Sequence, residues 1–341
     1  MVIGRPLASE SGLILINKPR GITSFGVVSR LRKLTGIRRI GHTGTLDPFA
    51  DGLLPVCLGR ATVAVQFMDG YDKTYRLEIE FGRATDTHDL TGLTISEHQL
   101  TQTEQQELIH SDFAVLRDAV GNLPGEHLQT PPMYSAVKID GRKLYEYARK
   151  GQSIERKARQ IKIYSADLED VSLTDGILRA SIQIECSKGT YIRTIADDLG
   201  RHLGFGAHAR SLTRLRCGPF SLEQAFDLAD LENRRNNFPD QMSFVSHLNN
   251  QGLLLPVEKA FTDFPDITLP ETAAIRLIKG QSLRPGETGL PQTDWPPVGV
   301  RTVIYSRGSL IAVGCLLPAA DGDLQFKTER VLIDLADFQQ S

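Results

Sequence analysis

The chain has 341 residues, of which 40% are hydrophobic, and its 39 lysines and arginines against 41 aspartates and glutamates give a formal net charge of −2. Such a chain is long enough for two folded domains, because single cores stop growing at roughly 250–300 residues. No apolar run reaches the roughly 20 residues that a membrane span needs, and the N-terminus MVIGRPLASESG lacks a secretory signal, so we expect a cytoplasmic protein without membrane contact.

The first predicted elements are a strand at residues 12–19 and a helix at residues 23–36. The strand is a short apolar run that ends at a proline. The helix has a capping residue, Thr23 or Ser24, at its start and Gly36 at its end, which are typical helix boundaries.

Residues 73–82 alternate strictly between apolar and polar side chains, which predicts a half-buried strand. Its apolar face carries Tyr75, Leu77, Ile79 and Phe81. Tyr75 is therefore either a core residue or part of a site at the edge of that core. Residues 101–121 begin with the pattern Thr-x-x-Glu, which is a capping box, and predict one helix.

A second strand and helix follow at residues 177–189 and 190–204, the helix capped by Thr190. Arg193 falls in the first turn of this helix, where the helix dipole disfavours a cation by about 0.3–1 kcal/mol. A carboxylate should therefore hold it there. The candidates are Asp197, one turn further along the same helix, and an aspartate from another segment, such as Asp47.

The C-terminal region differs in composition from the rest. Residues 222–341 carry 10 basic and 16 acidic residues, whereas residues 1–221 carry 29 and 25. Three strand-like runs, at residues 298–306, 309–317 and 324–333, are separated by glycine-containing turns and predict a small β-barrel.

The basic residues of the N-terminal region are clustered. Residues 138–162 hold nine basic and three acidic residues, with Tyr145 and Tyr147 among them. Such a segment suits a nucleic-acid backbone with stacking platforms nearby. A solvated helix face is the alternative, and charge alone does not decide between the two.

Asp47 lies in a glycine-rich run, with Gly41 and Gly44 before it and Pro48 after it. The spacing does not match a nucleotide-binding P-loop. An aspartate in this position either caps a turn or presents a carboxylate to a cleft. Asp51 follows, but no histidine or cysteine cluster completes a metal site, and the four cysteines stand singly. If Asp47 is catalytic, it acts without a metal.

Several long motifs occur together in one order. They are LILINKPRGITSF, GHTGTLDPFADGLLPVCLGRAT, KTYRLEIEFGRATDTHDLTG, QTPPMYSAVKIDGRKLYEYARKG, CSKGTYIRTIADDLG and LTRLRCGPF. This set resembles the TruB family of tRNA pseudouridine synthases over most of residues 12–220. The region near residues 266–335 resembles the family's PUA-type RNA-binding domain less closely.

The resemblance implies an α+β fold. It comprises a mixed, largely antiparallel sheet with flanking helices at residues 1–258, and a small PUA-like β-barrel at residues 259–341. The implied reaction is the isomerisation of uridine to pseudouridine at position 55 in the T-loop of tRNA. The reaction needs no cofactor, because it involves no net redox change and no net consumption of water. We expect a monomer that acts on the tRNA T-arm without a guide RNA or a protein subunit.

The resemblance also assigns roles to individual residues. Asp47 is the expected nucleophile, Arg193 its partner, and Tyr75 the residue that stacks on the flipped base. Three further residues are expected to line the pocket or to hold displaced nucleotides: His42, Tyr191 and Leu212. Contacts to the RNA backbone are expected from Lys18, Lys138, Arg142 and Lys143.

Two other functions remain open at this stage. The chain could be the catalytic subunit of an RNA-guided pseudouridylation particle, although the sequence shows none of the basic extensions that such subunits usually carry. It could also be an RNA-binding or RNA-folding protein without catalysis, for which the same basic surface would suffice. The role of Asp47 separates an enzyme from a binding protein.

Overall fold

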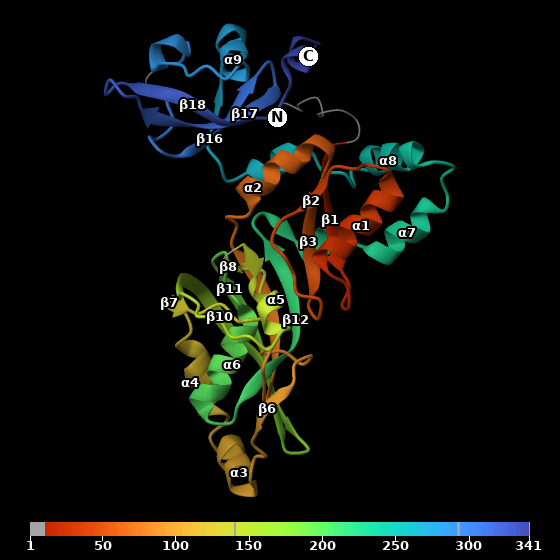
Figure 1. Ribbon diagram of the computed structural model, residues 1–341, viewed down its shortest axis with the longest axis vertical. Coiled ribbons are helices and arrows are strands. Elements are labelled where there is room, and N and C mark those ends of the chain that lie inside the picture. Colours follow the sequence, from red (N-terminus) through yellow and green to blue (C-terminus); the bar gives the residue numbers. More distant parts are fainter. Residues whose placement is uncertain (1–10, 140, 292–293, 341) are drawn as a thin grey trace.

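The computed structural model describes residues 11–139, 141–291 and 294–340, and its strands form two main sheets (Figure 1). The large sheet has eight strands in one path and two that pair beside it. Along the path lie β14 (Phe226–Asp227), β1 (Gly12–Lys18), β3 (Asp51–Leu58), β12 (Ala207–Cys217), β4 (Lys73–Phe81), β11 (Ile177–Cys186), β10 (Arg159–Thr174) and β7 (Gly125–Gln129); the others are β2 (Ile40–His42), beside β3, and β13 (Phe220–Ser221), beside β12.

Most neighbouring strands of this sheet are antiparallel, while β1 with β14 and β3 with β12 are parallel. The prediction of a mixed, largely antiparallel sheet is confirmed. Two short hairpins lie outside it and carry residues near the site. They are β5 (Arg83–Thr85) with β6 (Thr94–Glu97), and β8 (Lys138–Ile139) with β9 (Arg142–Lys143).

Helices flank the large sheet in two groups, and each group encloses a core (Figure 1). The helices before the C-terminal region are α1 (Ser24–Thr35), α2 (Val65–Met68), α3 (Gln102–His110), α4 (Ala114–Gly121), α5 (Leu144–Ala148), α6 (Ile192–Leu203), α7 (Leu228–Arg235) and α8 (Gln241–Asn250). Helices α4 and α6 pack against β4, β10 and β12, whereas α1 and α7 pack near β1 and β2. The first group covers the core that borders the site.

The N-terminal strand and helix lie where the sequence predicts them. The strand predicted at residues 12–19 is β1, and the helix predicted at residues 23–36 is α1. The Thr23 hydroxyl accepts a hydrogen bond from the Gly26 amide, and Gly36 ends the helix in the left-handed region at φ 75°. The strand predicted at residues 73–82 is β4, and its four predicted apolar positions are buried.

Two helix predictions need correction. Residues 101–121 form two helices, because Asp112 and Phe113 both adopt positive φ and break the chain after α3; the predicted capping box is present. The helix predicted to begin at Thr190 begins at Ile192 instead. Thr190 does not cap it, since its hydroxyl donates to the Ser187 carbonyl at 2.9 Å.

The C-terminal sheet has four strands, β15 (Asp266–Thr268), β16 (Arg301–Ser306), β17 (Ser309–Pro318) and β18 (Leu324–Val331). It lies at one end of the molecule with α9 (Glu271–Ile278) and α10 (Leu335–Gln340), and α3 lies at the other end (Figure 1). Among the described strands no pairing closes this sheet into the predicted barrel, because β15 and β18 remain its edges.

The C-terminal sheet is packed directly on the rest of the chain. One cluster of buried residues contains Leu15 and Phe67 together with Val313 and Leu332 of the C-terminal sheet region. This apolar contact fixes the two parts against each other. Within the described residues, no helix has both the length and the apolar character that crossing a membrane requires.

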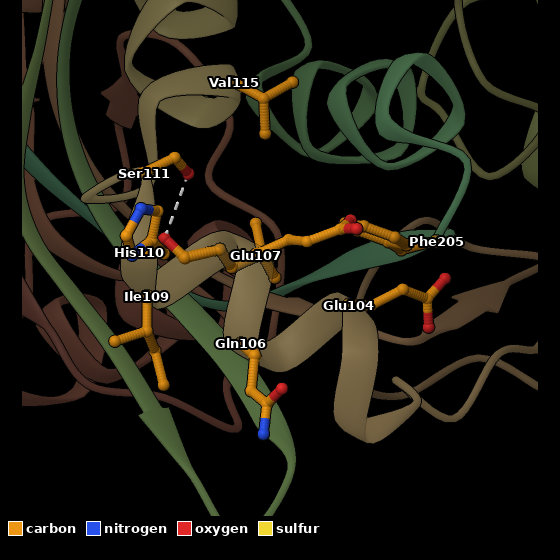
Figure 2. A pocket seen from close by; sticks show the side chains of 9 residues that line it. Glu104, Gln106, Glu107, Ile109, His110, Ser111, Val115 and Phe205 are labelled. Atoms are coloured by element: carbon orange, nitrogen blue, oxygen red, sulfur yellow. Dashed lines mark hydrogen bonds between the residues drawn. The ribbon is translucent and has the colours of Figure 1, made fainter.

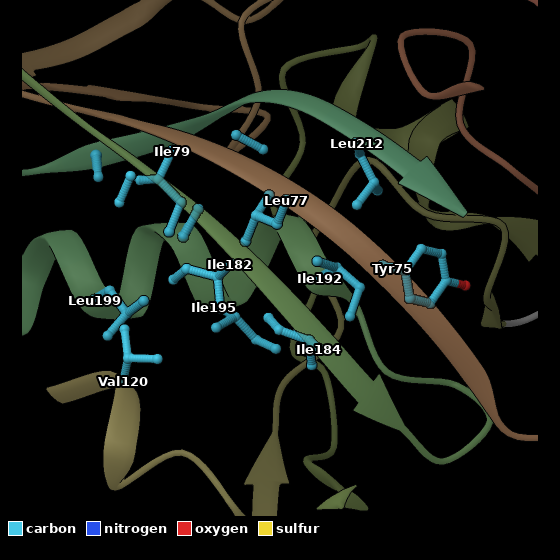
Figure 3. Close-up of a cluster of buried hydrophobic side chains, with 14 of the residues drawn as sticks. Tyr75, Leu77, Ile79, Val120, Ile182, Ile184, Ile192, Ile195, Leu199 and Leu212 are labelled. Atoms are coloured by element: carbon cyan, nitrogen blue, oxygen red, sulfur yellow. The ribbon is translucent and has the colours of Figure 1, made fainter. Parts of the chain in front are cut away.

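The core beneath α6 extends as far as Tyr75 on β4. In Figure 3, Tyr75, Ile192 and Leu212 lie together at one end of this cluster, and Val120 and Leu199 lie at the other. Tyr75 is 8% exposed. It therefore belongs to the core and also faces the space beyond the end of the core.

Candidate active site

Asp47 lies in the loop between β2 and β3, and contacts with the start of α1 hold this loop. The Ser24 hydroxyl bonds to both backbone polar groups of Leu46, and the Gly21 amide donates to the Pro48 carbonyl at 2.8 Å. Among the described residues, no turn amide donates a hydrogen bond to the Asp47 carboxylate. The side chain is 34% exposed, so the carboxylate is partly covered, and it does not cap a turn.

Arg193 supplies the positive charge beside Asp47. Its Nε lies 3.5 Å from Asp47 Oδ2 and its Nη1 lies 3.3 Å from Asp89 Oδ2, while Nη2 donates to the Tyr134 carbonyl. The alternative partner, Asp197, pairs instead with Arg201 at 2.7 Å. The cation in the first turn of α6 is therefore held by carboxylates from two other segments.

A pocket of about 360 Å³ opens around this ion pair. Its wall brings together residues from the loop between β2 and β3, β4, β12, the segment after β7 and the start of α6. The predicted site residues among them are Asp47, Tyr75, Tyr191, Arg193 and Leu212. Five of the predicted residues, from four separate stretches of sequence, thus meet at one pocket.

Burial raises the pKa of Asp47 above its ordinary value of 3.8, and this effect exceeds the opposing influence of Arg193 and Lys18. Asp89 raises the pKa further. Arg193 therefore limits the rise without cancelling it. The pocket contains a carboxylate that is more basic than a free aspartate and still faces a cation.

Two predicted site residues lie elsewhere. Lys18 is fully buried and its ammonium donates to the carbonyls of Pro19 and Ile22, both at 3.0 Å, so it does not face an RNA backbone in this structure. Burial also lowers the pKa of Lys18 to about 8. His42 ends β2 and is not among the residues that line the pocket.

The predicted RNA-facing residues lie on the small β8–β9 hairpin. Lys138 and Arg142 are exposed, and Lys143 is half-buried with its ammonium 5.5 Å from the Tyr145 ring. The chain enters this hairpin directly from Ser135, Ala136 and Val137, which line the pocket. The basic segment is therefore continuous in sequence with the pocket wall.

The sequence analysis missed Asp89, which is 3% exposed and faces Arg193. Its other carboxylate oxygen accepts hydrogen bonds from the hydroxyls of Thr87 and Thr91 and from the Thr91 amide. An aspartate between two threonines in a tight turn is a signal for such a network. Its contact with Arg193, however, arises only from the fold.

A second hollow, of about 890 Å³, lies by α3 and α4 at the end of the molecule farthest from the C-terminal sheet. Figure 2 shows Glu104, Glu107 and Val115 around it. Glu104 is already engaged in the capping box and with His98. The residues that the resemblance assigns to catalysis lie elsewhere. No group of three or more potential metal-ligating side chains occurs in the described part of the chain.

Comparison with known proteins identifies the family. Residues 32–192 match the model described as TruB family pseudouridylate synthase (N terminal domain), and residues 193–262 match the tRNA pseudouridylate synthase B C-terminal domain. The chain is 38% identical over 323 residues to tRNA pseudouridine synthase B of Halalkalibacterium halodurans, covering 94% of this chain and 97% of the relative. It is 42% identical over 282 residues to the protein of the same name from Dehalococcoides mccartyi, covering 83% and 87%.

Among solved structures, the chain is similar to a chain in the crystal structure of a Cbf5-Nop10-Gar1 complex. The TM-score is 0.67 at 23% identity, and the match covers 96% of this chain and 86% of that chain. This likeness supports the mixed α+β fold described above. The two family models and the relatives that match along most of their length show that the chain belongs to the TruB family and is a pseudouridine synthase, an isomerase.

Proposed function

We propose that this protein isomerises uridine to pseudouridine at position 55 in the T-loop of tRNA, with Asp47 as the nucleophile. The observation that carries this proposal is the Asp47–Arg193 ion pair at the wall of a pocket that Tyr75 also lines. The names of the relatives support tRNA as the substrate class.

The reaction is an intramolecular transfer. The bond between C1′ and N1 of the uridine breaks, the uracil rotates, and a bond between C1′ and C5 forms; C5 then loses its proton and N1 carries one in the product. Asp47 assists by attack on C1′ or on C6, or by supporting a glycal route, and each requires the ionised carboxylate. Arg193 favours that ionised form against the effect of burial.

The target base must leave the stack of the loop before it reaches Asp47. Base flipping costs a few kcal/mol, and stacking on an aromatic ring returns roughly 1–3 kcal/mol per base. Tyr75 offers such a ring at the pocket wall, with Leu212 and Tyr191 beside it. A packed wall of this kind also keeps the detached uracil in place until it recombines.

We further propose that the β8–β9 hairpin contacts the RNA backbone through Lys138, Arg142 and Lys143. These side chains are exposed or half-buried at the edge of the segment that leads into the pocket. We assign residues 1–258 to catalysis and residues 259–341 to a PUA-like domain, and we place the enzyme in the cytoplasm. The division into domains follows from the family resemblance.

The test is tritium release from C5 of uridine in a T-arm transcript, with purified protein and no guide RNA or partner protein. We expect release in proportion to pseudouridine formed, and none from a transcript in which the target uridine is replaced by cytidine while other uridines keep their label. Activity only after addition of a guide RNA would favour the RNA-guided particle, and binding without release would favour a non-catalytic RNA-binding protein.

A further inference from the structure

The ion pair between Asp47 and Arg193 is not fixed by a direct hydrogen bond at its closest approach. Arg193 Nε lies 3.5 Å from Asp47 Oδ2 but has no hydrogen-bond partner among the described residues, although it is buried. Asp89 and the Tyr134 carbonyl hold the far end of the guanidinium. The separation of Nε from Asp47 therefore also depends on where the backbone on each side is held.

On the side of Asp47, the backbone is held by Ser24. This residue is the first of α1 and is 1% exposed. Its hydroxyl accepts from the Leu46 amide at 2.9 Å and donates to the Leu46 carbonyl at 3.2 Å. One side chain thus satisfies both polar backbone groups of the residue that directly precedes the nucleophile.

On the side of Arg193, the backbone is held by Gln129 in the same manner. Gln129 ends β7 and is 6% exposed. Its Oε1 accepts from the Tyr191 amide at 2.8 Å and its Nε2 donates to the Tyr191 carbonyl at 3.1 Å. Tyr191 is the N-cap residue of α6, so the carboxamide of Gln129 bonds both backbone polar groups of the residue at which this helix begins.

We propose that Ser24 and Gln129 are positioning residues that set the distance between Asp47 and Arg193. The proposal rests on the function proposed above for those two residues. Each side chain bonds both backbone groups of a residue one or two positions from the ion pair. A shift of Ser24 or Gln129 therefore moves Asp47 or Arg193 relative to its partner. Small misplacements of reacting groups of about 1 Å cost on the order of 100-fold in rate.

The alternative is that both side chains only stabilise the fold, as any buried hydrogen bond does. The chain offers a matched control for this alternative. Thr288, in the C-terminal region, is fully buried, and its hydroxyl donates to the Pro285 carbonyl at 2.5 Å and accepts from the Leu290 amide at 3.2 Å. Like Ser24, it donates to one backbone carbonyl and accepts from one backbone amide, here of two different residues, but it lies outside the site.

The experiment compares Ser24→Ala, Gln129→Met and the control Thr288→Val in the full-length enzyme. It measures single-turnover pseudouridine formation in a T-arm transcript, dissociation constants for the same RNA, and melting temperatures. We expect the first two variants to lose roughly 10- to 100-fold in rate while RNA affinity changes by less than about twofold. The control should lose melting temperature and keep its rate.

A double-mutant cycle then separates positioning from general stabilisation. If Gln129 acts through Arg193, Gln129→Met should cost less than about twofold in the Arg193→Met background, against 10- to 100-fold in the wild-type background. An equal cost in both backgrounds would overturn the proposal, as would a wild-type rate in Ser24→Ala and Gln129→Met. If Gln129→Met does not fold, Gln129→Glu takes its place, since it keeps the size and the acceptor but loses the donor to Tyr191.

Failure of the positioning role can be told apart from failure of the proposed reaction. Wild-type activity and its loss in Asp47→Asn are measured with the same transcript. If the wild type is active, Asp47→Asn is inactive, and Ser24→Ala and Gln129→Met retain the wild-type rate, only the positioning role of Ser24 and Gln129 fails.

Discussion

Arg193 Nε lies 3.5 Å from Asp47 Oδ2, and the same guanidinium contacts the buried carboxylate of Asp89 at 3.3 Å. The cation is thus shared between a carboxylate that faces the pocket and one that does not. This sharing means that Arg193 supports both the proposed chemistry and the fold, and that the two roles can be separated by changing its partners one at a time.

Replacing Arg193 by methionine should lower both activity and stability. The variant leaves Asp89, which is 3% exposed, without its cation, and breaking a buried ion pair costs about 3–5 kcal/mol. In Arg193→Met combined with Asp89→Asn, we expect melting temperature to recover while pseudouridine formation stays low. Thermal unfolding and tritium release measure the two effects. Recovery of activity together with stability would show that Arg193 has only a structural role.

The acid limb of the pH–rate profile should lie above pH 3.8, because burial raises the pKa of Asp47 and only the ionised carboxylate reacts. The charged groups that act on Asp47 are Arg193 and Lys18, which lower its pKa, and Asp89, which raises it. Arg193→Met should therefore move the limb to higher pH and Asp89→Asn to lower pH. Rates measured as kcat/KM across pH provide the check, and shifts of the opposite sign would contradict the assignment.

Replacing Tyr75 should separate stacking from packing. Tyr75→Phe keeps the ring and should keep most of kcat/KM, whereas Tyr75→Leu should lose the stacking contribution of about 1–3 kcal/mol. That loss corresponds to roughly 5- to 150-fold in kcat/KM. Both variants keep an apolar side chain at a position where Tyr75 is 8% exposed. Melting temperatures should therefore change little, whereas kcat/KM should fall clearly in Tyr75→Leu. Equal rates for the two variants would argue against stacking.

The β8–β9 hairpin should contribute to RNA affinity and not to the chemical step. Lys138→Ala and Arg142→Ala each remove one exposed cation. If each contacts a phosphate, binding should weaken and the slope of log K against log salt should fall by about 0.7–0.9 per residue. Titrations of a tRNA transcript at several salt concentrations measure this, with single-turnover rates at saturating enzyme as the control. An unchanged salt slope would remove these residues from the interface.

The sequence predicted the elements whose signals are local. Strict alternation in β4 placed Tyr75 on the buried face, and the residues Thr23 and Gly36 marked the ends of α1. It did not predict the break after α3, because neither Asp112 nor Phe113 is a residue that usually marks positive φ in the way glycine does. Local sequence patterns carry little information about such turns.

The residues of the site could be predicted from the sequence, but their contacts with one another could not. The family motifs brought Asp47, Tyr75 and Arg193 together, and the structure places them at one pocket. The contact of Asp89 with Arg193 joins segments that are distant in sequence, and a pattern read along the chain does not contain such a tertiary contact. The RNA contact of Lys18 was expected from the family resemblance, and the structure instead buries this side chain at the end of β1.

Asp47 is the proposed nucleophile, and the substitution Asp47→Asn tests this role with one change of side chain. The amide preserves the size of the side chain but removes its charge, so the pocket and the RNA surface should remain intact. The measurement is tritium release from C5 of uridine in a T-arm transcript, with the dissociation constant for that transcript measured in parallel. We predict that the variant binds the RNA with an affinity close to that of the wild type and releases no tritium above background. Release at the wild-type rate would contradict the account.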